Sequence, residues 1–508
     1  MHLTIARGLV CGILVLLTLS FTALPGTAAP RAAPADFTAI DRYVEQELQA
    51  TRLPGLALGI VQGDQIVHLR GFGVADSKGR PVTPQTPFIL ASVSKSFTAL
   101  AIMQLVEAGK VELDAPVQRY LPWFRVADAQ ASAQITVRHL LNQTSGLSTL
   151  TGNTYGLHKD LSDGALEQEA RALRTVELAN PVGEIQQYCN MNYSILGLIV
   201  QVVSGEPYER YVREHILNPL EMGESFASPS EAEQHGLATG YQFWFGQPVP
   251  SELSYNRAVV PAGYISSSAE DMVHYLIANL NGGRYGAAEL LSPAGIAEMH
   301  GTAGGKSYAM GWHGEEINSV PVVMHAGDID GFYASMILVP EGEWGIVLLI
   351  NGLNYLQPRI QGIDDGVMSM LVGRQPPPVS NYDVQVLMLL VAALGACILQ
   401  ILGIARSIAL LRRWRVQPVR RPRGAVGVAR RVALPLVLNL LWALVCLVIV
   451  PQWAEVPLLR LVRVDVGLVI VVSGGIALVW GILRALFAFF VLRTPGAPIA
   501  VEAPAAAR

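Results

Sequence analysis

The segment 91-ASVSKSFTAL-100 places a serine and a lysine one turn apart at the start of an apolar helix. Positions i and i+3 of a helix share a face, so Ser92 and Lys95 are expected to be neighbours. A serine hydroxyl becomes a good nucleophile when a base takes its proton, and a buried lysine held neutral can be that base. Free backbone N–H groups at the start of a helix can stabilise an oxyanion. The spacing therefore indicates nucleophilic catalysis, although the same pattern also occurs on ordinary protein surfaces.

Two further residue pairs lie later in the chain. Tyr188 and Asn190 stand at the entrance to an apolar helix, where a tyrosine offers a second proton carrier and an asparagine an amide that grips a substrate. His325 and Gly327 fall on an expected strand, where a glycine lets a substrate backbone lie against the sheet edge. Each has an ordinary alternative, Tyr188 as a packed aromatic and His325 as a polar residue at a strand end. The three pairs in this order favour a catalytic site.

The elements that must position these residues lie between 30 and 376. Two apolar runs in 55–76 flank the turn at Gly63 and predict a β-hairpin, and three β-rich runs late in the domain predict adjacent antiparallel strands. The chain between them is mostly helical, which predicts an α/β fold: an antiparallel β-sheet flanked by helices, with an inserted all-helical subdomain. The expected helices are 37–50, 92–108, 192–205 and 207–217, with a short helix and loop at 136–148, and the late strands are 320–327, 333–340 and 345–351.

Both ends of the chain are apolar. Residues 1–29 have a basic start, a long apolar run and small residues at the end, as in a cleaved secretory signal peptide, with an uncleaved anchor helix as the alternative. Within 377–508, three further apolar stretches have the length of transmembrane helices. These expected spans are 384–405, 432–450 and 466–483.

The segment between the first two spans, residues 406–431, holds nine arginines and no acidic residue. By the positive-inside rule it is expected to be a cytoplasmic loop, which places the domain before the first span outside the cytoplasm. The sequence therefore predicts a multi-pass protein of the plasma membrane with membrane lipid as a contact. A nucleic-acid patch is disfavoured because the segment lies between two spans.

Charge and cysteine content narrow the function classes. Residues 1–376 carry a net charge of −14 and residues 377–508 one of +10, so the exported domain is not expected to bind nucleic acid. Of the four cysteines, only Cys189 lies in that domain, so no disulfide is expected within it. The ten histidines contain no H-x-H or H-E-x-x-H pair, and neither a metal site nor a cofactor is expected.

The domain resembles the serine β-lactamase and penicillin-binding-protein superfamily, over about residues 37–376. Within it, the domain looks most like the branch of class C β-lactamases, D-alanyl-D-alanine carboxypeptidases and esterases. Three separated motifs led by S-x-x-K are typical of these enzymes. The segments that carry the resemblance are 91-ASVSKSFTAL-100, 113-LDAPVQRYLP-122, 136-TVRHLLNQTSGL-147, 187-QYCNMNYSILG-197, 261-PAGYISSSAEDM-272, 308-YAMGW-312 and 325-HAGDIDGF-332.

The resemblance implies a β-lactamase/transpeptidase-like fold and a role for each motif. Ser92 would be the acylated nucleophile, Lys95 its proton-relay partner and Tyr188 the general base or acid. Asn190 would bind the substrate amide, and His325 and Gly327 would form the third motif. The backbone N–H groups of Ser92 and Asp328 would form the oxyanion hole.

Three positions depart from the family pattern. His325 stands where many β-lactamases and transpeptidases have a lysine that holds a substrate carboxylate, and this favours esterase-like members. Gln143 stands where relatives often carry histidine, and we expect it to be a loop position with little effect. Asp328 places a carboxylate beside the expected oxyanion donor, which disfavours acidic substrates unless it points away or pairs with a cation.

Two classes of function stay open. The first is a serine hydrolase that acts through an acyl-enzyme on an ester, an amide or a D-amino-acid peptide. The second is a non-hydrolytic receptor or scaffold with a β-lactamase-like domain. The motif set favours the enzyme, and the short cytoplasmic segments argue against a stand-alone receptor. The expected partners are a small-molecule or peptide substrate and membrane lipid, and the sequence identifies no protein partner.

Overall fold

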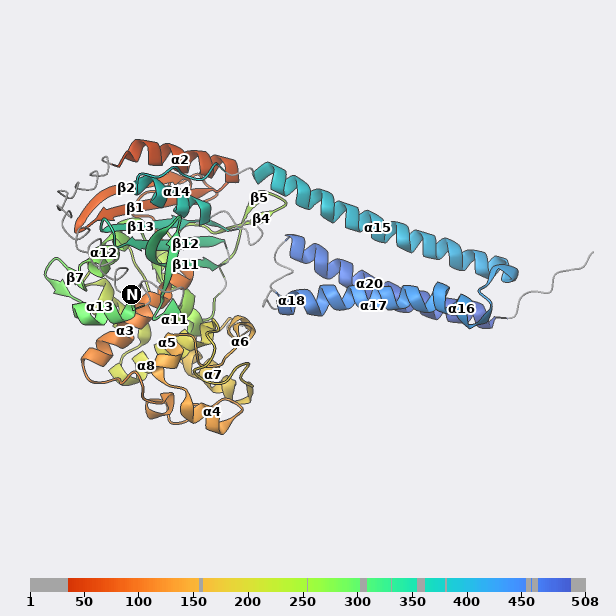
Figure 1. Ribbon diagram of the computed structural model, residues 1–508, viewed down its shortest axis with the longest axis horizontal. Coiled ribbons are helices and arrows are strands. Elements are labelled where there is room, and N and C mark those ends of the chain that lie inside the picture. Colours follow the sequence, from red (N-terminus) through yellow and green to blue (C-terminus); the bar gives the residue numbers. More distant parts are fainter. Residues whose placement is uncertain are drawn as a thin grey trace, which may run out of the picture.

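A seven-stranded antiparallel sheet forms the centre of the computed structural model, in the order β2-β1-β13-β12-β11-β10-β9 (Figure 1). The expected hairpin is present as β1 and β2, and the three expected late strands are β11, β12 and β13, paired in sequence order. The strands are β1 (Gly55–Gln62), β2 (Gln65–Gly73), β9 (Tyr308–Ala309), β10 (Trp312–Ile317), β11 (Val320–Ile329), β12 (Phe332–Val339) and β13 (Trp344–Ile350).

The structure describes residues 35–494 apart from 155–158, 254, 302–307, 330, 354–360, 380–381, 454–457 and 459–464. The expected signal peptide, residues 1–29, lies outside the described residues.

Helices cover both faces of the sheet. On one face α2 (Phe37–Thr51) and α14 (Gln361–Leu371) pack over an apolar cluster, and on the other lie α12 (Ala269–Leu280) and α3 (Ser94–Glu107) (Figure 1). Every residue of β12 is buried, as expected for a strand covered on both faces. The confirmed arrangement is an antiparallel sheet between two helical layers.

The expected helical region lies between β2 and β9 and packs beside the sheet (Figure 1). Its central helix α8 is buried on nearly all sides and ends at Gly205, whose φ of 78° suits a glycine. Besides α3 and α12, the described helices of this part of the chain are η1 (Ala91–Val93), η2 (Val117–Arg119), α4 (Ala129–Gln134), α5 (Val137–Leu141), α6 (Thr149–Thr154), α7 (Ala165–Ala172), η3 (Leu173–Thr175), α8 (Asn190–Ser204), α9 (Tyr208–Val212), η4 (Arg213–Leu217), α10 (Pro229–Gln234), η5 (Arg257–Val259), α11 (Val260–Gly263) and α13 (Pro293–Met299).

A small hairpin in this region was not expected from the sequence. Strands β4 (Tyr241–Trp244) and β5 (Gln247–Pro250) pair with each other, and β4 also pairs in parallel with β14 (Gly352–Leu353). Two of the four residues of β5 are prolines, which argue against a strand in sequence analysis. They are tolerated because β5 is the outer strand of its three-stranded sheet. The remaining short strands are β3 (Phe88–Ile89), β6 (Ser266–Ser267), β7 (Arg284–Tyr285) and β8 (Ala288–Glu289).

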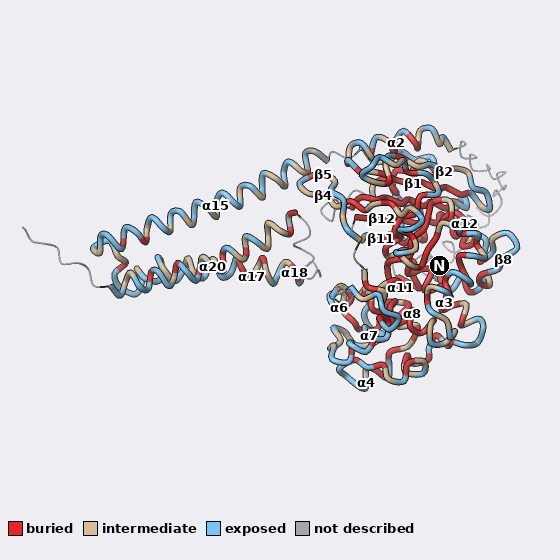
Figure 2. Tube along the Cα trace, turned by 180° about the vertical axis from the view of Figure 1, so that it is seen from behind, coloured by how far each residue is buried: buried red, intermediate tan, exposed pale blue. Residues whose placement is uncertain are grey.

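Within the part of the chain that the structure describes, three helical segments after the domain are long and apolar enough to cross a membrane, with mean hydropathies of 2.6, 2.7 and 2.2. They lie side by side and project from one side of the domain, and most of their surface is not buried (Figures 1 and 2). The candidate spans are Val386–Val416, Gly424–Trp453 and Gly467–Arg493. They belong to α15 (Tyr382–Val416), to a continuous run of α16 (Gly424–Val428), η7 (Ala429–Ala433), α17 (Leu434–Leu444), η8 (Val445–Ile449) and α18 (Val450–Trp453), and to α20 (Asp465–Arg493).

The basic segment 406–431 corrects one expectation, because most of it is helical and only its middle part forms the connection between two helices. Arginine is a good helix former, so the charges do not end the helix. Leu411 and Trp414 of α15 also pack against Ala488 of α20, which extends the bundle beyond the expected spans.

Candidate active site

Ser92 lies in the one-turn helix η1, which leads directly into α3. The residue before it, Ala91, has a φ of 46°, an unfavourable conformation for an alanine. Backbone strain of this kind persists only where the surrounding structure imposes it, and it often marks a functional site. The 3-10 turn of η1 thus precedes the regular α-helix, which begins at Ser94 and not at Ser92 as expected, and Ser92 is half-buried.

Lys95 is fully buried, and its ammonium group faces Ser92 as the spacing predicted. Lys95 Nζ lies 3.0 Å from Ser92 Oγ and donates a 2.6 Å hydrogen bond to the carbonyl oxygen of Ala262 in α11. Burial lowers the pKa of Lys95 to about 7, against the opposing influence of Cys189 and Asp328. A neutral amine is therefore well populated at neutral pH.

Tyr188 completes the immediate surroundings of the serine. Its hydroxyl donates a 2.8 Å hydrogen bond to Ser92 Oγ, and Lys95 Nζ lies 4.8 Å from the centre of its ring. The edge of Tyr308 packs against the same ring at 5.8 Å. Burial, followed by Tyr308, raises the pKa of Tyr188 well above its usual 10, so its hydroxyl keeps its proton at neutral pH. The three side chains predicted from sequence meet at Ser92 Oγ.

Strand β11 closes the site on the sheet side. A Cβ atom on Gly327 would lie 2.4 Å from the backbone nitrogen of Ser92, so only glycine permits this approach. The pairing of β10 with β11 ends at Met324, so within the described residues the edge of β11 from His325 onward is unpaired on that side. Asp328 follows Gly327 on this edge, which places the expected third motif beside the serine.

His325 is buried in a neutral form. Its Nδ1 donates a 2.6 Å hydrogen bond to the carbonyl oxygen of Ala326, and His313 and Tyr308 pack around its ring. Burial, then the proximity of His313 and Lys95, lowers the pKa of His325 well below 6.5. Among the described residues its Nε2 has no hydrogen-bond partner, so it presents an acceptor. This position therefore lacks the positive charge that a lysine would supply.

Asn190 and Cys189, two sequence neighbours of Tyr188, have different surroundings. Asn190 begins α8, two residues after Tyr188, and donates a 3.3 Å hydrogen bond to the side-chain oxygen of Asn153 in α6. Cys189 is fully buried, and burial raises the pKa of its thiol to about 11. It is therefore held as a neutral packing residue rather than as a thiolate nucleophile.

The sequence and the fold are similar to those of known proteins. Residues 40–364 match the family described as Beta-lactamase. The chain belongs to the β-lactamase family. It is a member of the wider superfamily of serine β-lactamases and penicillin-binding proteins, which are serine hydrolases.

Three relatives illustrate the breadth of the family. The chain is 31% identical over 324 residues to Protein flp of Staphylococcus aureus (strain MW2), covering 63% of this chain and 64% of that protein. It is 31% identical over 320 residues to Penicillin-binding protein 4 of Amycolatopsis lactamdurans, covering 59% and 81% of the two chains. The octameric penicillin-binding protein homologue from Pyrococcus abyssi has a TM-score of 0.59 at 26% identity, covering 70% of this chain and 82% of that chain. The match thus spans just under two thirds of the staphylococcal protein.

Gln143 has a larger structural role in this family member than the sequence indicated. Its side-chain oxygen accepts hydrogen bonds from the backbone nitrogen of Cys189 at 2.9 Å and from Asn192 Nδ2 at 2.6 Å. The side chain is buried, and φ is 61°. The surrounding segment could be recognised in the sequence but this role could not, because neither the left-handed backbone nor a contact across 46 residues leaves a local signal.

Replacing Gln143 by alanine is expected to lower kcat/KM by about tenfold to a hundredfold, because the segment that carries Tyr188 loses a buried acceptor. Stability should also fall by about 1–3 kcal/mol, because the partner donors stay buried. Ester hydrolysis and denaturant unfolding measure the two effects. Gln130→Ala is the matched control at an exposed position. Activity equal to that of the control would show that Gln143 does not position Tyr188.

Proposed function

We propose that this chain is a membrane-anchored serine hydrolase whose domain, residues 30–376, lies on the side of the membrane away from the cytoplasm. It acts through an acyl-enzyme on an ester, an amide or a D-amino-acid peptide. The observation that carries the proposal is the position of Ser92 Oγ between a fully buried Lys95 and the hydroxyl of Tyr188. A surface Ser/Lys pair would have neither the burial nor the second proton carrier.

In the first half of the proposed reaction, neutral Lys95 takes the proton of Ser92, and Ser92 Oγ attacks the carbonyl carbon of the substrate. The backbone N–H groups of Ser92 and Asp328 stabilise the oxyanion. Tyr188 gives its proton to the leaving group, whose bond to the carbonyl carbon breaks, and regains a proton from Lys95. The products of this half are the acyl-enzyme and the released alcohol or amine.

In the second half, a water molecule attacks the acyl carbon. Lys95, again neutral, takes a proton from the water through Tyr188, and the proton returns to Ser92 as the acid is released. Ser92, Lys95 and Tyr188 are then in their starting protonation states.

The neutral surroundings of His325 support esters and uncharged amides over substrates that need a carboxylate anchor. A lysine at this place would attract a carboxylate, whereas a neutral imidazole offers only its Nε2 acceptor. Beside the larger effect of burial, Asp328 on the same strand acts to raise the pKa values of Lys95 and Tyr188, so its negative charge reaches the site and also disfavours an anionic substrate. We therefore place esters first, and retain D-amino-acid peptides because the relatives include penicillin-binding proteins.

The orientation follows from charge. Arginines gather at the end of α15 and the start of the second helical segment, far from the domain along the helices (Figure 1). The positive-inside rule assigns that end to the cytoplasm and the domain to the opposite side of the plasma membrane.

Covalent labelling of the full-length protein in detergent tests the proposal. A fluorophosphonate is expected to add one adduct to the wild type, located at Ser92 by peptide mapping, and none to Ser92→Ala. Ser96→Ala is the matched control, since Ser96 lies about one turn later, in α3, and donates to a backbone carbonyl instead. A penicillin and a short-chain aryl ester, tested in parallel, compare the substrate classes. A wild type that gains no adduct and turns over no ester would instead support the non-hydrolytic receptor or scaffold.

A further inference from the structure

The β4–β5 hairpin presents an uncharged apolar tip to solvent. Residues 236–251 contain no charged side chain, although the domain around them is acidic. The side chains of Phe245 and Val249 are each 41% exposed, and Trp244 is half-buried beside them. Aromatic residues with few charges are typical of segments that lie at the boundary between membrane and water.

The turn of this hairpin touches the ends of two membrane helices. The backbone nitrogen of Phe245 donates a 2.6 Å hydrogen bond to Asp465 at the first turn of α20. A Cβ atom on Gly246 would lie 2.9 Å from Val386 in the first turns of α15, so this helix packs directly against the turn. Arg52, after α2, holds the turn from the domain side through the carbonyl oxygen of Gly246.

These contacts fix the depth of the tip. Val386 begins the first candidate span, and Asp465 lies two residues before the third. Trp453 ends the second span and is 85% exposed, so an interfacial aromatic lies at the same end of the bundle. Figure 1 shows β4 and β5 beside the start of α15, at the end of the bundle nearest the domain. The apolar tip therefore lies level with the ends of the candidate spans.

We propose that the tip of the β4–β5 hairpin, Phe245 and Val249, inserts into the interface of the bilayer that the three helices cross. The occupant of this surface is lipid of the outer leaflet, in continuity with the helix ends that the turn already contacts. The inference rests on the membrane topology proposed above and does not depend on hydrolysis.

The base of the hairpin is joined to the strand that closes the active site. The backbone nitrogen of Tyr241 donates to the carbonyl oxygens of Gly331 and Asn351, and Gly331 lies in the turn between β11 and β12. A Cβ atom on Gly331 would lie 2.6 Å from Tyr241 N, so the two segments are in close contact. A hairpin held at the lipid surface therefore also holds the end of β11 that carries Asp328.

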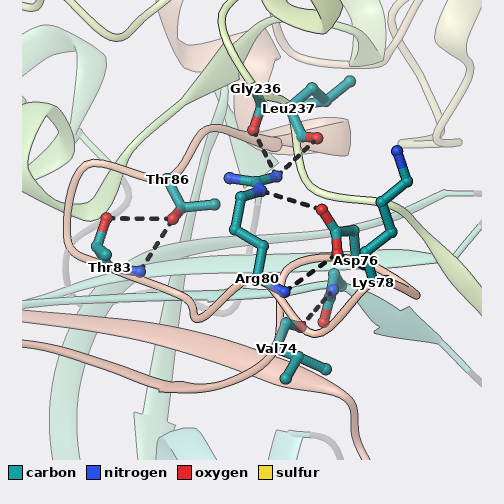
Figure 3. A network of polar contacts seen from close by, with 9 residues as sticks. Val74, Asp76, Lys78, Arg80, Thr83, Thr86, Gly236 and Leu237 are labelled. Atoms are coloured by element: carbon teal, nitrogen blue, oxygen red, sulfur yellow. Dashed lines mark hydrogen bonds and ion pairs between the residues drawn. The ribbon is translucent and has the colours of Figure 1, made fainter.

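A second connection fixes the segment that leads into the hairpin. Figure 3 shows Arg80 donating to the carbonyl oxygens of Gly236 and Leu237, at 2.9 and 3.4 Å. Asp76 in turn accepts hydrogen bonds from the backbone and side chain of Arg80 and from the backbone of Lys78. The segment that leads into the hairpin is thus held in place by Arg80.

Quenching of a fluorophore by lipid nitroxides tests the insertion. Single cysteines at Phe245→Cys and, separately, Val249→Cys carry an environment-sensitive NBD label, in a background with Cys11, Cys397 and Cys446 replaced and buried Cys189 retained. The full-length protein is reconstituted in phosphatidylcholine nanodiscs. We expect strong quenching at both positions by a headgroup nitroxide lipid and little quenching by aqueous iodide.

Ile66→Cys is the matched control, because Ile66 is also 41% exposed but lies on β2. Its label should be quenched by iodide and not by lipid. In a separate variant that keeps Cys397 and has only Cys11 and Cys446 replaced, a label on Cys397 in α15 reports whether the helices cross the bilayer, through quenching by a nitroxide deep in the acyl chains.

The outcomes separate the two proposals. If the label on Cys397 is quenched by lipid while the labels at 245 and 249 are quenched by iodide and not by lipid, like the label at 66, the insertion alone would be overturned. Shielding from iodide without lipid quenching would indicate a second copy or another protein on the tip, and would also overturn it. No quenching of Cys397 would overturn the topology and the insertion together, while fluorophosphonate labelling of Ser92 would leave the hydrolase proposal intact.

Discussion

Lys95→Met is expected to remove nearly all hydrolytic activity and, at the same time, to make the folded protein more stable at neutral pH. Activity falls because Ser92 loses its base, which corresponds to roughly a thousandfold loss in kcat/KM. Stability rises because methionine fills the buried site without a charge to desolvate. The two effects have opposite signs, so general unfolding cannot explain the lost activity.

The pH dependence of this stability follows from the pKa of Lys95, which is lowered from 10.5 to about 7. Between these values the unfolded chain binds a proton that the folded lysine has released, so the stability of the wild type rises with pH across this window. Below about pH 7 the folded protein bears the full free-energy cost of burying the charged lysine, about 5 kcal/mol. The lost hydrogen bond to the carbonyl oxygen of Ala262 offsets part of the gain. The advantage of Lys95→Met should therefore be greatest below pH 7 and shrink toward pH 10.

Denaturant unfolding at pH 6 and pH 9, together with ester hydrolysis, measures both effects. The wild-type kcat/KM should rise with pH through about 7, because only the neutral amine accepts a proton. Lys110→Met is the matched control, as it removes the same charge from an exposed position. A Lys95→Met protein that keeps its activity would show that another group deprotonates Ser92.

Asp364→Asn is expected to change the pH dependence of stability on the opposite face of the sheet. Asp364 in α14 is buried and accepts hydrogen bonds from the hydroxyls of Tyr333 and Ser335 on β12. Burial raises the pKa of its carboxyl group from 3.8 to about 7. Between those values the folded protein holds a proton that the unfolded chain has lost, so stability falls as pH rises. Above about pH 7 the loss of stability that comes from burying the ionised carboxylate is complete, at about 4 kcal/mol.

An asparagine has nothing to titrate and still provides an oxygen acceptor for one hydroxyl. The stability of Asp364→Asn should therefore stay nearly level between pH 4 and 7, and should exceed that of the wild type at pH 8. Denaturant unfolding at pH 4.5, 6 and 8 gives the comparison. The neighbouring Asp365→Asn is the control, since Asp365 is only half enclosed and its pKa is raised less. Parallel curves for all three proteins would contradict the buried protonated carboxyl.

The sequence was most informative where chemistry depends on local spacing. Ser92 and Lys95 face each other because they are three residues apart in a helix, and this geometry is independent of the rest of the fold. The strands β11 to β13 were also found, since short β-rich runs bounded by Gly, Pro and Asn pair with their neighbours in sequence.

Other parts depend on distant contacts and could not be predicted. The carbonyl oxygen of Ala262 that holds Lys95 comes from 167 residues away. The left-handed backbone of Gln143 is imposed by its surroundings, as glutamine has no preference for it. The β4–β5 hairpin was hidden by its prolines, and the length of α15 by its arginines. The first three features are set by the tertiary environment. The extension of α15 instead agrees with the helix preference of arginine, and it was missed because the charges indicated a loop between two spans.

The close approach of Gly327 to the backbone of Ser92 has a practical consequence. The reactive serine exists in its working form only when β11, η1, α8 and α11, which come from widely separated parts of the chain, have all docked. A covalent probe of Ser92 would therefore count natively folded molecules in a membrane preparation, where lipid obscures spectroscopic unfolding. The labelled fraction would measure the yield of folding in the bilayer, including for variants that have lost no catalytic residue.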